Sequence, residues 1–312
     1  MNAYFARGKL LLSAEYLVLH GCRALAVPLR LGQSLEKIAS PDRHVFSWNA
    51  FCGQKKWFSA RMDPASLKII GTSHHDKAVR LQEMIRACID LMPGFQKELF
   101  RWDAATRLDF SPEYGLGSSS TLTALLAEWA EVNPLALHFM VSEGSGYDVA
   151  CALASGPILY QLKEQSPRYR HVPFRPPFRH QLYFAWLGRK QETAAHLREI
   201  AAGLKPGHKS VSFFNQLTMK MIESRTLEEF SEHMEIHEEA LSKLIGIERI
   251  SSRFEGLPGT VKSLGAWGGD FILIASGAEE KELKNYLGRK EISVIYWYKD
   301  IVYEGEELQP EA

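Results

Sequence analysis

Apolar side chains recur at helical spacing in several stretches of the chain. Between residues 75 and 92 they come every three or four positions, and Pro93 and Gly94 then end the pattern. The same spacing predicts a helix over residues 121–132, which ends at Asn133 and Pro134. Further helices are predicted over residues 211–222, 227–244 and 279–287, and one that opens at Thr193.

Short apolar runs between these helices predict strands. They lie at residues 10–12, 16–19, 24–29, 107–110, 158–162, 182–187, 271–276 and 293–298, with more strand-like sequence from 47 to 57 around Gly53. Gly21, between the second and third runs, predicts a hairpin. Because strands and helices alternate irregularly, the pattern favours an α+β fold over a regular βαβ repeat. Prolines and arginines crowd residues 165–179, which predicts a linker or domain crossover.

Composition changes this picture little, but it excludes some partners. The chain has 312 residues, of which 46% are hydrophobic, and it balances 37 Lys and Arg against 37 Asp and Glu. No overall charge therefore draws it to nucleic acid or to an anionic membrane, and no run of about 18 apolar residues predicts a membrane span. Scattered cysteines and an N-terminus that reaches charge at once favour a cytoplasmic protein without a zinc site or a signal peptide.

The strongest candidate for chemistry is the run GLGSSS at residues 115–120, between a predicted strand and a predicted helix. Glycines let the backbone approach a ligand closely, and the N-terminus of a helix offers unpaired N–H groups to an anion. No GK[ST] follows, so the run is not a Walker A loop. It suits a phosphate group; the alternative interpretation is a serine cluster that caps the helix.

Three further segments carry candidate groups. Lys9 begins an apolar strand and Glu15 lies on the next segment, so that a lysine and a carboxylate can flank one cleft; a solvated lysine is the alternative. Asp148 in GSGYDVA either caps a helix or orients and deprotonates a substrate hydroxyl. The glycine-rich stretch at residues 265–269 either forms a tight turn or marks the close approach of a nucleotide.

In their order along the chain, these four segments resemble the motifs of the GHMP kinases, the family of galactokinase, homoserine kinase, mevalonate kinase and phosphomevalonate kinase. GKLLLSAEYLVLHG is similar to the first motif, with Ala14 in place of a glycine, and PEYGLGSSSTLT to the second. GAWGGD is similar to the third, with Trp267 at a glycine position. GSGYDVA resembles the GSGFDVA of phosphomevalonate kinases and a subgroup named for a GYDIA sequence and associated with isoprenoid metabolism.

The resemblance implies a two-domain GHMP kinase fold of the α+β class. Residues 1–165 would form an ATP-binding domain like domain 2 of ribosomal protein S5, and residues 166–312 a ferredoxin-like domain. ATP and the substrate would lie between them. The protein is expected to be a monomer or a homodimer.

The resemblance also implies a role for each candidate residue. Lys9 and Asp148 are the expected catalytic pair, and Ser119 is the expected contact for Mg²⁺. The phosphates of ATP are expected on Gly115, Leu116, Gly117, Ser118, Ser119 and Ser120. The acceptor is expected to contact Glu15, Ser145, Gly146, Lys190, Gly265 and Gly268. A metal-binding glutamate has no clear counterpart, and Glu128 and Glu143 remain the candidates.

The activity implied is transfer of the γ-phosphoryl group of ATP to a small acceptor of the mevalonate pathway. Phosphomevalonate is the first choice, with mevalonate as the alternative, and a ligand sensor with little turnover is the candidate from another class. His233 and His237 lie four residues apart on a predicted helix, a spacing that can bind metal. Because glutamates surround them, we interpret them as part of a hydrated acidic face.

Overall fold

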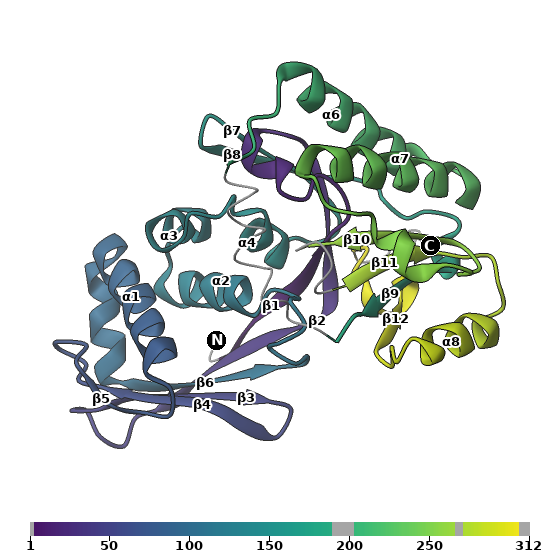
Figure 1. The fold of residues 1–312 in the computed structure, drawn as a ribbon. Coiled ribbons are helices and arrows are strands. Elements are labelled where there is room, and N and C mark those ends of the chain that lie inside the picture. The colour runs from purple at the N-terminus through teal and green to yellow at the C-terminus, as the bar shows by residue number, and fades with distance from the viewer. Residues whose placement is uncertain (1–2, 189–202, 266–270, 306–312) are drawn as a thin grey trace, which may run out of the picture. The chain divides into compact units, whose positions relative to one another are not determined.

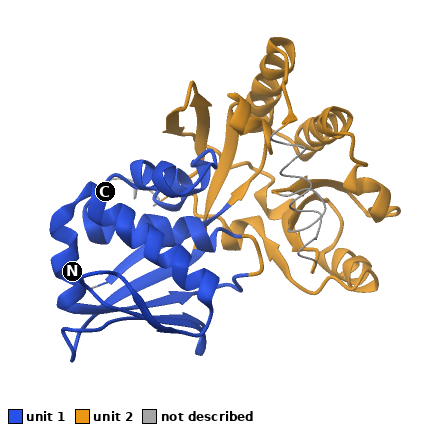
Figure 2. Cartoon of the chain, turned by 60° about the vertical axis from the view of Figure 1, so that its left-hand side comes forward, with its two compact units in different colours: residues 1–9, 31–112, 116–153 blue, residues 10–30, 113–115, 154–312 orange. Residues whose placement is uncertain are grey.

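The chain forms two compact units. The computed structural model describes residues 3–188, 203–265 and 271–305. Unit 1 comprises residues 1–9, 31–112 and 116–153, and unit 2 comprises residues 10–30, 113–115 and 154–312 (Figure 2). The predicted domain boundary at residue 165 stays a prediction. Two long strands near the N-terminus, β1 (Ala3–Leu11) and β2 (Ala24–Ala39), each contribute residues to both units.

Unit 1 is a sheet with helices packed on it (Figure 1). Its strands pair in the order β5-β4-β3-β6-β2, β1 also pairs with β2, and β3 runs parallel to β6. The bounds of its other elements are β3 (Phe46–Cys52), β4 (Lys55–Met62), β5 (Ile69–Thr72), α1 (His75–Leu91), the 3-10 helix η2 (Pro93–Phe100), β6 (Trp102–Leu108), α2 (Ser118–Ala130), α3 (Pro134–Val141) and α4 (Tyr147–Ala152).

The core of unit 1 lies between this sheet and helices α1 and α2. Trp48 of β3, Ile85 of α1 and Trp129 of α2 are buried together in it. The ring of Trp129 meets that of Phe95 edge to face, with centroids 5.1 Å apart. Burial of a side chain such as that of Ile85 or Phe95 contributes about 1.5–3 kcal/mol. Since α2 is apolar along its buried side, this packing also fixes the position of its first turn.

Unit 2 contains an antiparallel sheet in the order β10-β11-β9-β12. The first residues of β2 also pair there with β7, and β7 pairs with β8. The bounds of its elements are the 3-10 helix η1 (Leu17–His20), β7 (Ile158–Lys163), β8 (Ser166–His171), the 3-10 helix η3 (Arg179–Gln181), β9 (Leu182–Trp186), α6 (His208–Glu223), α7 (Leu227–Ile245), the 3-10 helix η4 (Ile250–Phe254), β10 (Thr260–Leu264), β11 (Phe271–Ala275), α8 (Glu280–Arg289), β12 (Ile295–Trp297) and α9 (Tyr298–Ile301).

The two faces of the four-stranded sheet have different partners. Ile272 and Ile274 of β11 form a core with Leu283 and Leu287 of α8. Helix α7 contacts β10 and β11, and α6 packs on α7. Successive side chains of a strand point to opposite faces. Lys262 of β10 therefore points away from the α8 core and is fully buried.

Most predicted helices and strands are confirmed, including α1, α2, α6, α7, α8, β7, β9 and β11. The strand expected at residues 16–19, and its hairpin at Gly21, are wrong, because this segment is η1. Ala14 and Tyr16 have φ values of 60° and 62° there, which an extended strand does not allow. The helix expected to open at Thr193 lies outside the described residues.

Two predictions in the C-terminal part are wrong in detail. Residues 166–171 of the expected linker form β8, which pairs with β7. Pro167 is tolerated there because β8 is the last of the described strands in its sheet, so that no described strand needs its missing N–H. The strand expected over residues 293–298 is shorter, since α9 begins at Tyr298. Among the described residues, no helix combines the length and apolar character needed to cross a membrane.

Candidate active site

The loop before α2 is built around Gly117. This glycine has a left-handed backbone with φ of 100° and directly precedes the helix. A Cβ at this position would lie 2.7 Å from Ser120 Oγ and 3.2 Å from Lys9 Cγ, so that a side chain would require both neighbours to shift. The Lys9 N–H donates to Leu116 O at 2.9 Å. The end of β1 is thus bonded to the loop, and the Lys9 side chain lies against Gly117.

The three serines at the start of α2 have different surroundings. Ser120 is buried, and its hydroxyl donates to Gly117 O at 2.9 Å. Ser118 is half-buried and Ser119 exposed, and neither hydroxyl makes a hydrogen bond within the described part of the chain. The first N–H groups of a helix have no acceptor in the helix itself. The loop therefore presents backbone donors together with the hydroxyls of Ser118 and Ser119. The Ser120 hydroxyl instead stabilises the loop through its bond to Gly117 O.

Asp148 lies on a second helix of unit 1 that contacts α2. It is the second residue of α4, after Gly146, whose φ of 80° marks the start of the helix. The carboxylate is half-buried, and its Oδ1 accepts from the Val149 N–H at 3.0 Å. Ser145, directly before this turn, is buried.

Lys9 and Asp148 both influence the pKa values of Tyr147 and Cys151. Burial raises the pKa of Tyr147, the Lys9 ammonium lowers it, and the Asp148 carboxylate raises it. The same three influences act in the same directions on the pKa of the Cys151 thiol. Lys9 also hydrogen-bonds the Tyr147 side chain, and its Nζ lies 5.6 Å from the centre of that ring. A cation and a carboxylate thus both lie near Tyr147 and Cys151, and the side chain of the cation also lies against Gly117 at the start of α2.

Solved structures of three kinases share this architecture across nearly the whole chain. Streptococcus pneumoniae phosphomevalonate kinase, in complex with phosphomevalonate and AMPPNP, is 17% identical with a TM-score of 0.71, covering 95% of this chain and 99% of its own. For Methanococcus jannaschii mevalonate kinase the identity is 15%, the TM-score 0.70 and the coverage 94% and 96%. This chain has the GHMP kinase fold.

Galactokinase of Lactococcus lactis, complexed with galactose, has the same GHMP kinase fold at 12% identity and a TM-score of 0.67, covering 97% of this chain and 93% of its own. No protein-family profile matches the sequence, and no curated protein does. At such identities the likeness establishes the fold, as the sequence motifs predicted. It leaves the site residues as predictions.

The expected site residues are divided between the two units, with Lys9, Ser119 and Asp148 in unit 1 and Glu15, Gly115 and Gly265 in unit 2. Gly115 has φ of 73°, and Gly265, with φ of 65°, directly follows β10. Lys190 and Gly268 lie outside the described residues. Glu128 is nine residues beyond Ser119 on α2, which corresponds to about 13 Å along a helix. Glu143 lines a separate hollow with Arg80, Arg86 and Asp90.

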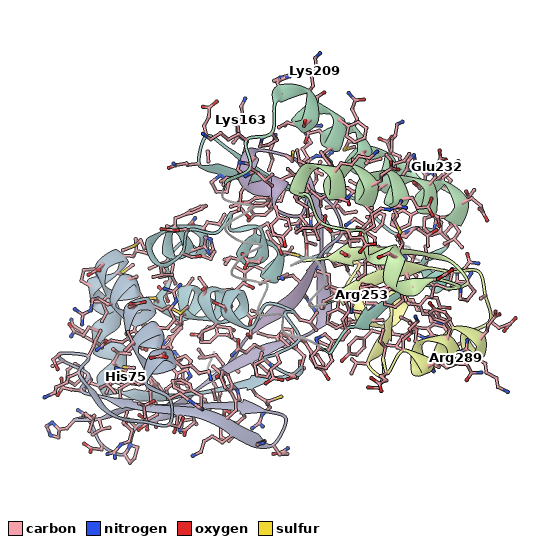
Figure 3. The ribbon with its side chains drawn as sticks, in the orientation of Figure 1. His75, Lys163, Lys209, Glu232, Arg253 and Arg289 are labelled. Atoms are coloured by element: carbon pink, nitrogen blue, oxygen red, sulfur yellow. The ribbon has the colours of Figure 1, made fainter. Side chains whose placement is uncertain are left out.

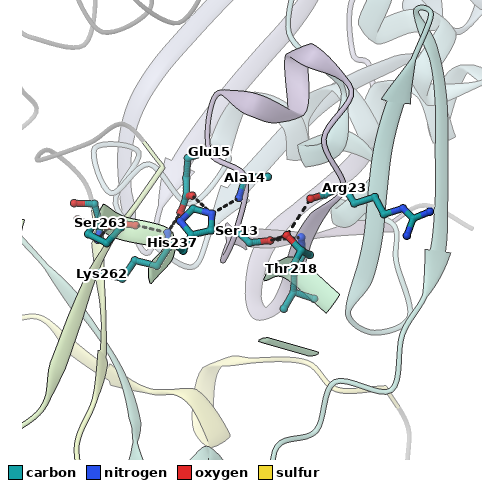
Figure 4. A network of polar contacts seen from close by, with 10 residues as sticks. Ser13, Ala14, Glu15, Arg23, Thr218, His237, Lys262 and Ser263 are labelled. Atoms are coloured by element: carbon teal, nitrogen blue, oxygen red, sulfur yellow. Dashed lines mark hydrogen bonds and ion pairs between the residues drawn. The ribbon is translucent and has the colours of Figure 1, made fainter. Parts of the chain in front are cut away.

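Glu15, expected to contact the acceptor, is buried in unit 2 and has other partners there. Lys262 donates to Glu15 Oε1 and also to Ser263 O, the latter at 2.9 Å (Figure 4). Glu15 Oε2 has no hydrogen bond within the described residues. Burial raises the pKa of Glu15, and the charge of Lys262 works against that rise. The structure thus pairs this carboxylate with a lysine that the sequence had not singled out.

His237 completes this buried cluster, and its interpretation as part of a hydrated acidic face is wrong. Its side chain is fully buried, and Nε2 accepts from the Ala14 N–H at 2.9 Å. Burial and the nearby Lys262 hold the pKa of His237 well below its usual value. The ring is therefore neutral, and Nδ1 carries the proton. Glu238 is buried too, and its Oε2 accepts from the Ser263 N–H at 3.2 Å.

The sequence did contain a pattern that indicates burial of His237, but the neighbouring glutamates favoured an exposed position. Phe230, Met234, His237 and Leu241 follow one another at steps of three and four, and all are buried. His237 therefore belongs to the apolar stripe of α7. For Lys262 no such signal exists, because its polar neighbour Ser263 and the short strand gave no reason to expect a buried charge.

Proposed function

We propose that this chain transfers the γ-phosphoryl group of ATP to a hydroxyl of a small acceptor. The observation that carries the proposal is that Lys9 and Asp148 of unit 1 lie near the same two side chains, with Lys9 also against Gly117 at the start of α2. Phosphoryl transfer needs a donor-rich cradle for the phosphates, a positive charge near the transferred group and a carboxylate at the attacking hydroxyl. The described residues supply a candidate for each.

Each group has a role that fits its surroundings. The backbone N–H groups and the Ser118 and Ser119 hydroxyls at the start of α2 would hold the phosphates. Asp148 would accept the proton of the acceptor hydroxyl, a step in which a positioned base typically contributes about 10²–10⁴-fold. Lys9 would stabilise the negative charge that develops on the attacking oxygen and on the phosphoryl group.

Magnesium fits this arrangement through Ser119. Its hydroxyl is exposed and uncommitted, and Mg²⁺ commonly takes few protein ligands and completes its shell with substrate phosphates and water. When bound, the ion would neutralise phosphate charge during transfer. Within the described residues, no three His, Cys, Asp or Glu side chains form a metal site by themselves. The phosphates of ATP and water would therefore provide the remaining ligands.

For the acceptor we propose phosphomevalonate, with mevalonate as the alternative. The support is the GSGYDVA sequence around Asp148 and the likeness to kinases whose structures contain these acceptors. Glu15, Ser145, Gly146, Lys190, Gly265 and Gly268 remain the predicted acceptor contacts. Because Glu15 is buried and bonded to Lys262, we expect it to act on the acceptor indirectly.

A coupled assay of ADP release tests the proposal with phosphomevalonate, mevalonate, homoserine and galactose offered in turn. We expect release that depends on phosphomevalonate. Release with mevalonate alone would select the alternative acceptor, and release with only homoserine or galactose would overturn the assignment to the mevalonate pathway. Omitting Mg²⁺ should abolish the signal with every acceptor.

A second candidate function is ligand sensing with little turnover. The observation that favours it is the position of Glu128, which lies well along α2 rather than beside the loop. For a sensor, calorimetry would detect binding of the ATP analogue AMPPNP while no acceptor supports ADP release. Turnover with any acceptor at rates ordinary for kinases, above about 1 s⁻¹, would rule this candidate out.

A further inference from the structure

Three arginines line a hollow in unit 2 that the proposed phosphoryl transfer does not use. Arg168 and Arg170 lie two residues apart on β8, so both side chains point to the same face of the β7–β8 hairpin. Gln161 and Leu159 of β7 lie directly across from them. Arg23, one residue before β2, completes a hollow of about 260 Å³, whose sixth lining residue is Tyr169.

Within the described part of the chain, the guanidinium groups of these arginines have no partners of opposite charge. None of the three makes an ion pair or a side-chain hydrogen bond with another residue that the structure describes, and no acidic residue lines the hollow. Arginines nearby in sequence differ, since Arg175 and Arg179 approach Glu304 Oε2 at 3.0 and 3.8 Å. Like charges gathered on one face of a sheet repel each other. An anion in the hollow would remove that repulsion.

The backbone that carries the arginines is firmly held. The Arg23 N–H donates to Asn215 Oδ1 at 2.6 Å, and the Thr218 hydroxyl donates to Arg23 O at 3.1 Å, both from helix α6. Gln161 Nε2 donates to Gly21 O at 2.8 Å. Figure 4 shows the Arg23 side chain extending away from Thr218, with its guanidinium group free of the polar network. The scaffold is thus fixed while the charged ends remain available.

We propose that this hollow binds a small diphosphate anion. Guanidinium groups bind phosphate oxygens through paired, charge-assisted hydrogen bonds, and three of them around one hollow suit two linked phosphate groups. A nucleic acid is a poorer match, because the chain has no net charge and the cluster is confined to one hairpin and the residue before β2. The site is independent of the proposed nucleotide loop and uses none of its residues.

Calorimetry with inorganic pyrophosphate at constant ionic strength tests this site. The variant Arg168→Gln/Arg170→Gln should raise the dissociation constant by at least about tenfold, since it removes two charge-assisted contacts. The matched control is Arg253→Gln/Arg289→Gln, which removes the same charge from exposed positions elsewhere in unit 2 (Figure 3). We expect the control to change the constant less than twofold.

Two further measurements separate this site from other anion binding. Lys9→Met should leave the arginine-dependent binding intact, because Lys9 belongs to the proposed nucleotide loop; loss of all pyrophosphate binding in that variant would overturn the proposal. Equal losses in the two arginine double variants, or no binding by the wild-type chain, would also overturn it. So would tighter binding of a thymidine oligonucleotide than of pyrophosphate. Circular dichroism and a urea midpoint confirm that each variant is folded.

Discussion

Each unit of this molecule contains a lysine beside a carboxylate, and the two neighbourhoods differ in their access to water. Lys9 and Asp148 in unit 1 are half-buried; Lys9 lies against Gly117 at the start of α2, and Asp148 lies on a helix that contacts α2. Lys262 and Glu15 in unit 2 are fully buried and bonded to each other. Charges that stay accessible can act on a ligand, whereas removal of one charge of a buried pair mainly lowers stability, because the other charge is left uncompensated. Residue types alone do not distinguish the two.

The largest effect is expected from the accessible pair. Asp148→Asn removes the proposed proton acceptor, and ADP release should fall about 10³-fold while binding of AMPPNP is kept. Asp90→Asn is the matched control, since it removes the same charge from an exposed position at the end of α1. Turnover by Asp148→Asn close to that of the control would refute the role of Asp148.

For the buried pair the expected effect is on stability. Lys262→Met leaves the Glu15 carboxylate buried without its partner, and the free energy of unfolding should fall by at least about 3 kcal/mol in urea titrations. Lys243→Met, which breaks an exposed pair with Glu239, should cost less than about 1 kcal/mol.

Removing both buried charges tests the cause of that loss. In Glu15→Gln/Lys262→Met no uncompensated charge remains, and we expect more than half of the lost stability to return. If the double variant is as unstable as Lys262→Met alone, the loss of stability comes from the changed shape of the side chain at position 262 and not from an uncompensated charge.

The pH dependence of the buried cluster should carry the signature of His237. Its folded-state pKa lies below 6.5, so below about pH 6.5 the unfolded chain takes up the proton first and stability falls, by up to about 1.4 kcal/mol per pH unit. The raised pKa values of Glu15 and Glu238 act in the opposite direction as the pH falls toward 4.5.

His237→Gln keeps an acceptor for the Ala14 N–H but cannot titrate. Urea midpoints measured between pH 5 and 8 should therefore decline less steeply with acid in this variant than in the wild type. His75→Gln, at the exposed start of α1, serves as the control (Figure 3). If all three curves fall in parallel, the buried ring is not the source of the acid sensitivity.

The smallest effect concerns the support of Lys9. Tyr147→Phe removes the hydroxyl that Lys9 hydrogen-bonds, and a single bond of this kind contributes about 1 kcal/mol. We expect turnover to fall by about fivefold, with the acceptor KM little changed. A loss as large as that of Asp148→Asn would instead make Tyr147 a direct participant.

The sequence predicted what depends on local pattern. Helix α7 was expected over residues 227–244 and runs from Leu227 to Ile245, because apolar spacing records its buried side. The loop at Gly117 was found in the same way, from glycines and hydroxyls between a strand and a helix. The GHMP kinase fold followed from the order of four motif-like segments along the chain.

What the sequence did not reveal depends on contacts between distant residues. The resemblance to the GHMP kinases assigned Glu15 to the acceptor, but the observed partner of this carboxylate, Lys262, lies 247 residues away. The 3-10 helix η1 was missed because Ala14 and Tyr16 adopt positive φ values that no local pattern of these residue types indicates. Lys262 of β10 is buried by tertiary packing, which the polar sequence around it did not indicate.

The division of unit 2 along the chain has a consequence for biosynthesis. Residues 10–30 belong to this unit, yet apart from residues 113–115 the rest of it begins at residue 154 and includes Lys262. During translation, Glu15 leaves the ribosome long before Lys262 is synthesised. Residues 10–30 therefore remain without these partners while the intervening chain is made. Closing so long a loop is slow, so the final assembly of this unit must follow translation of its last strands.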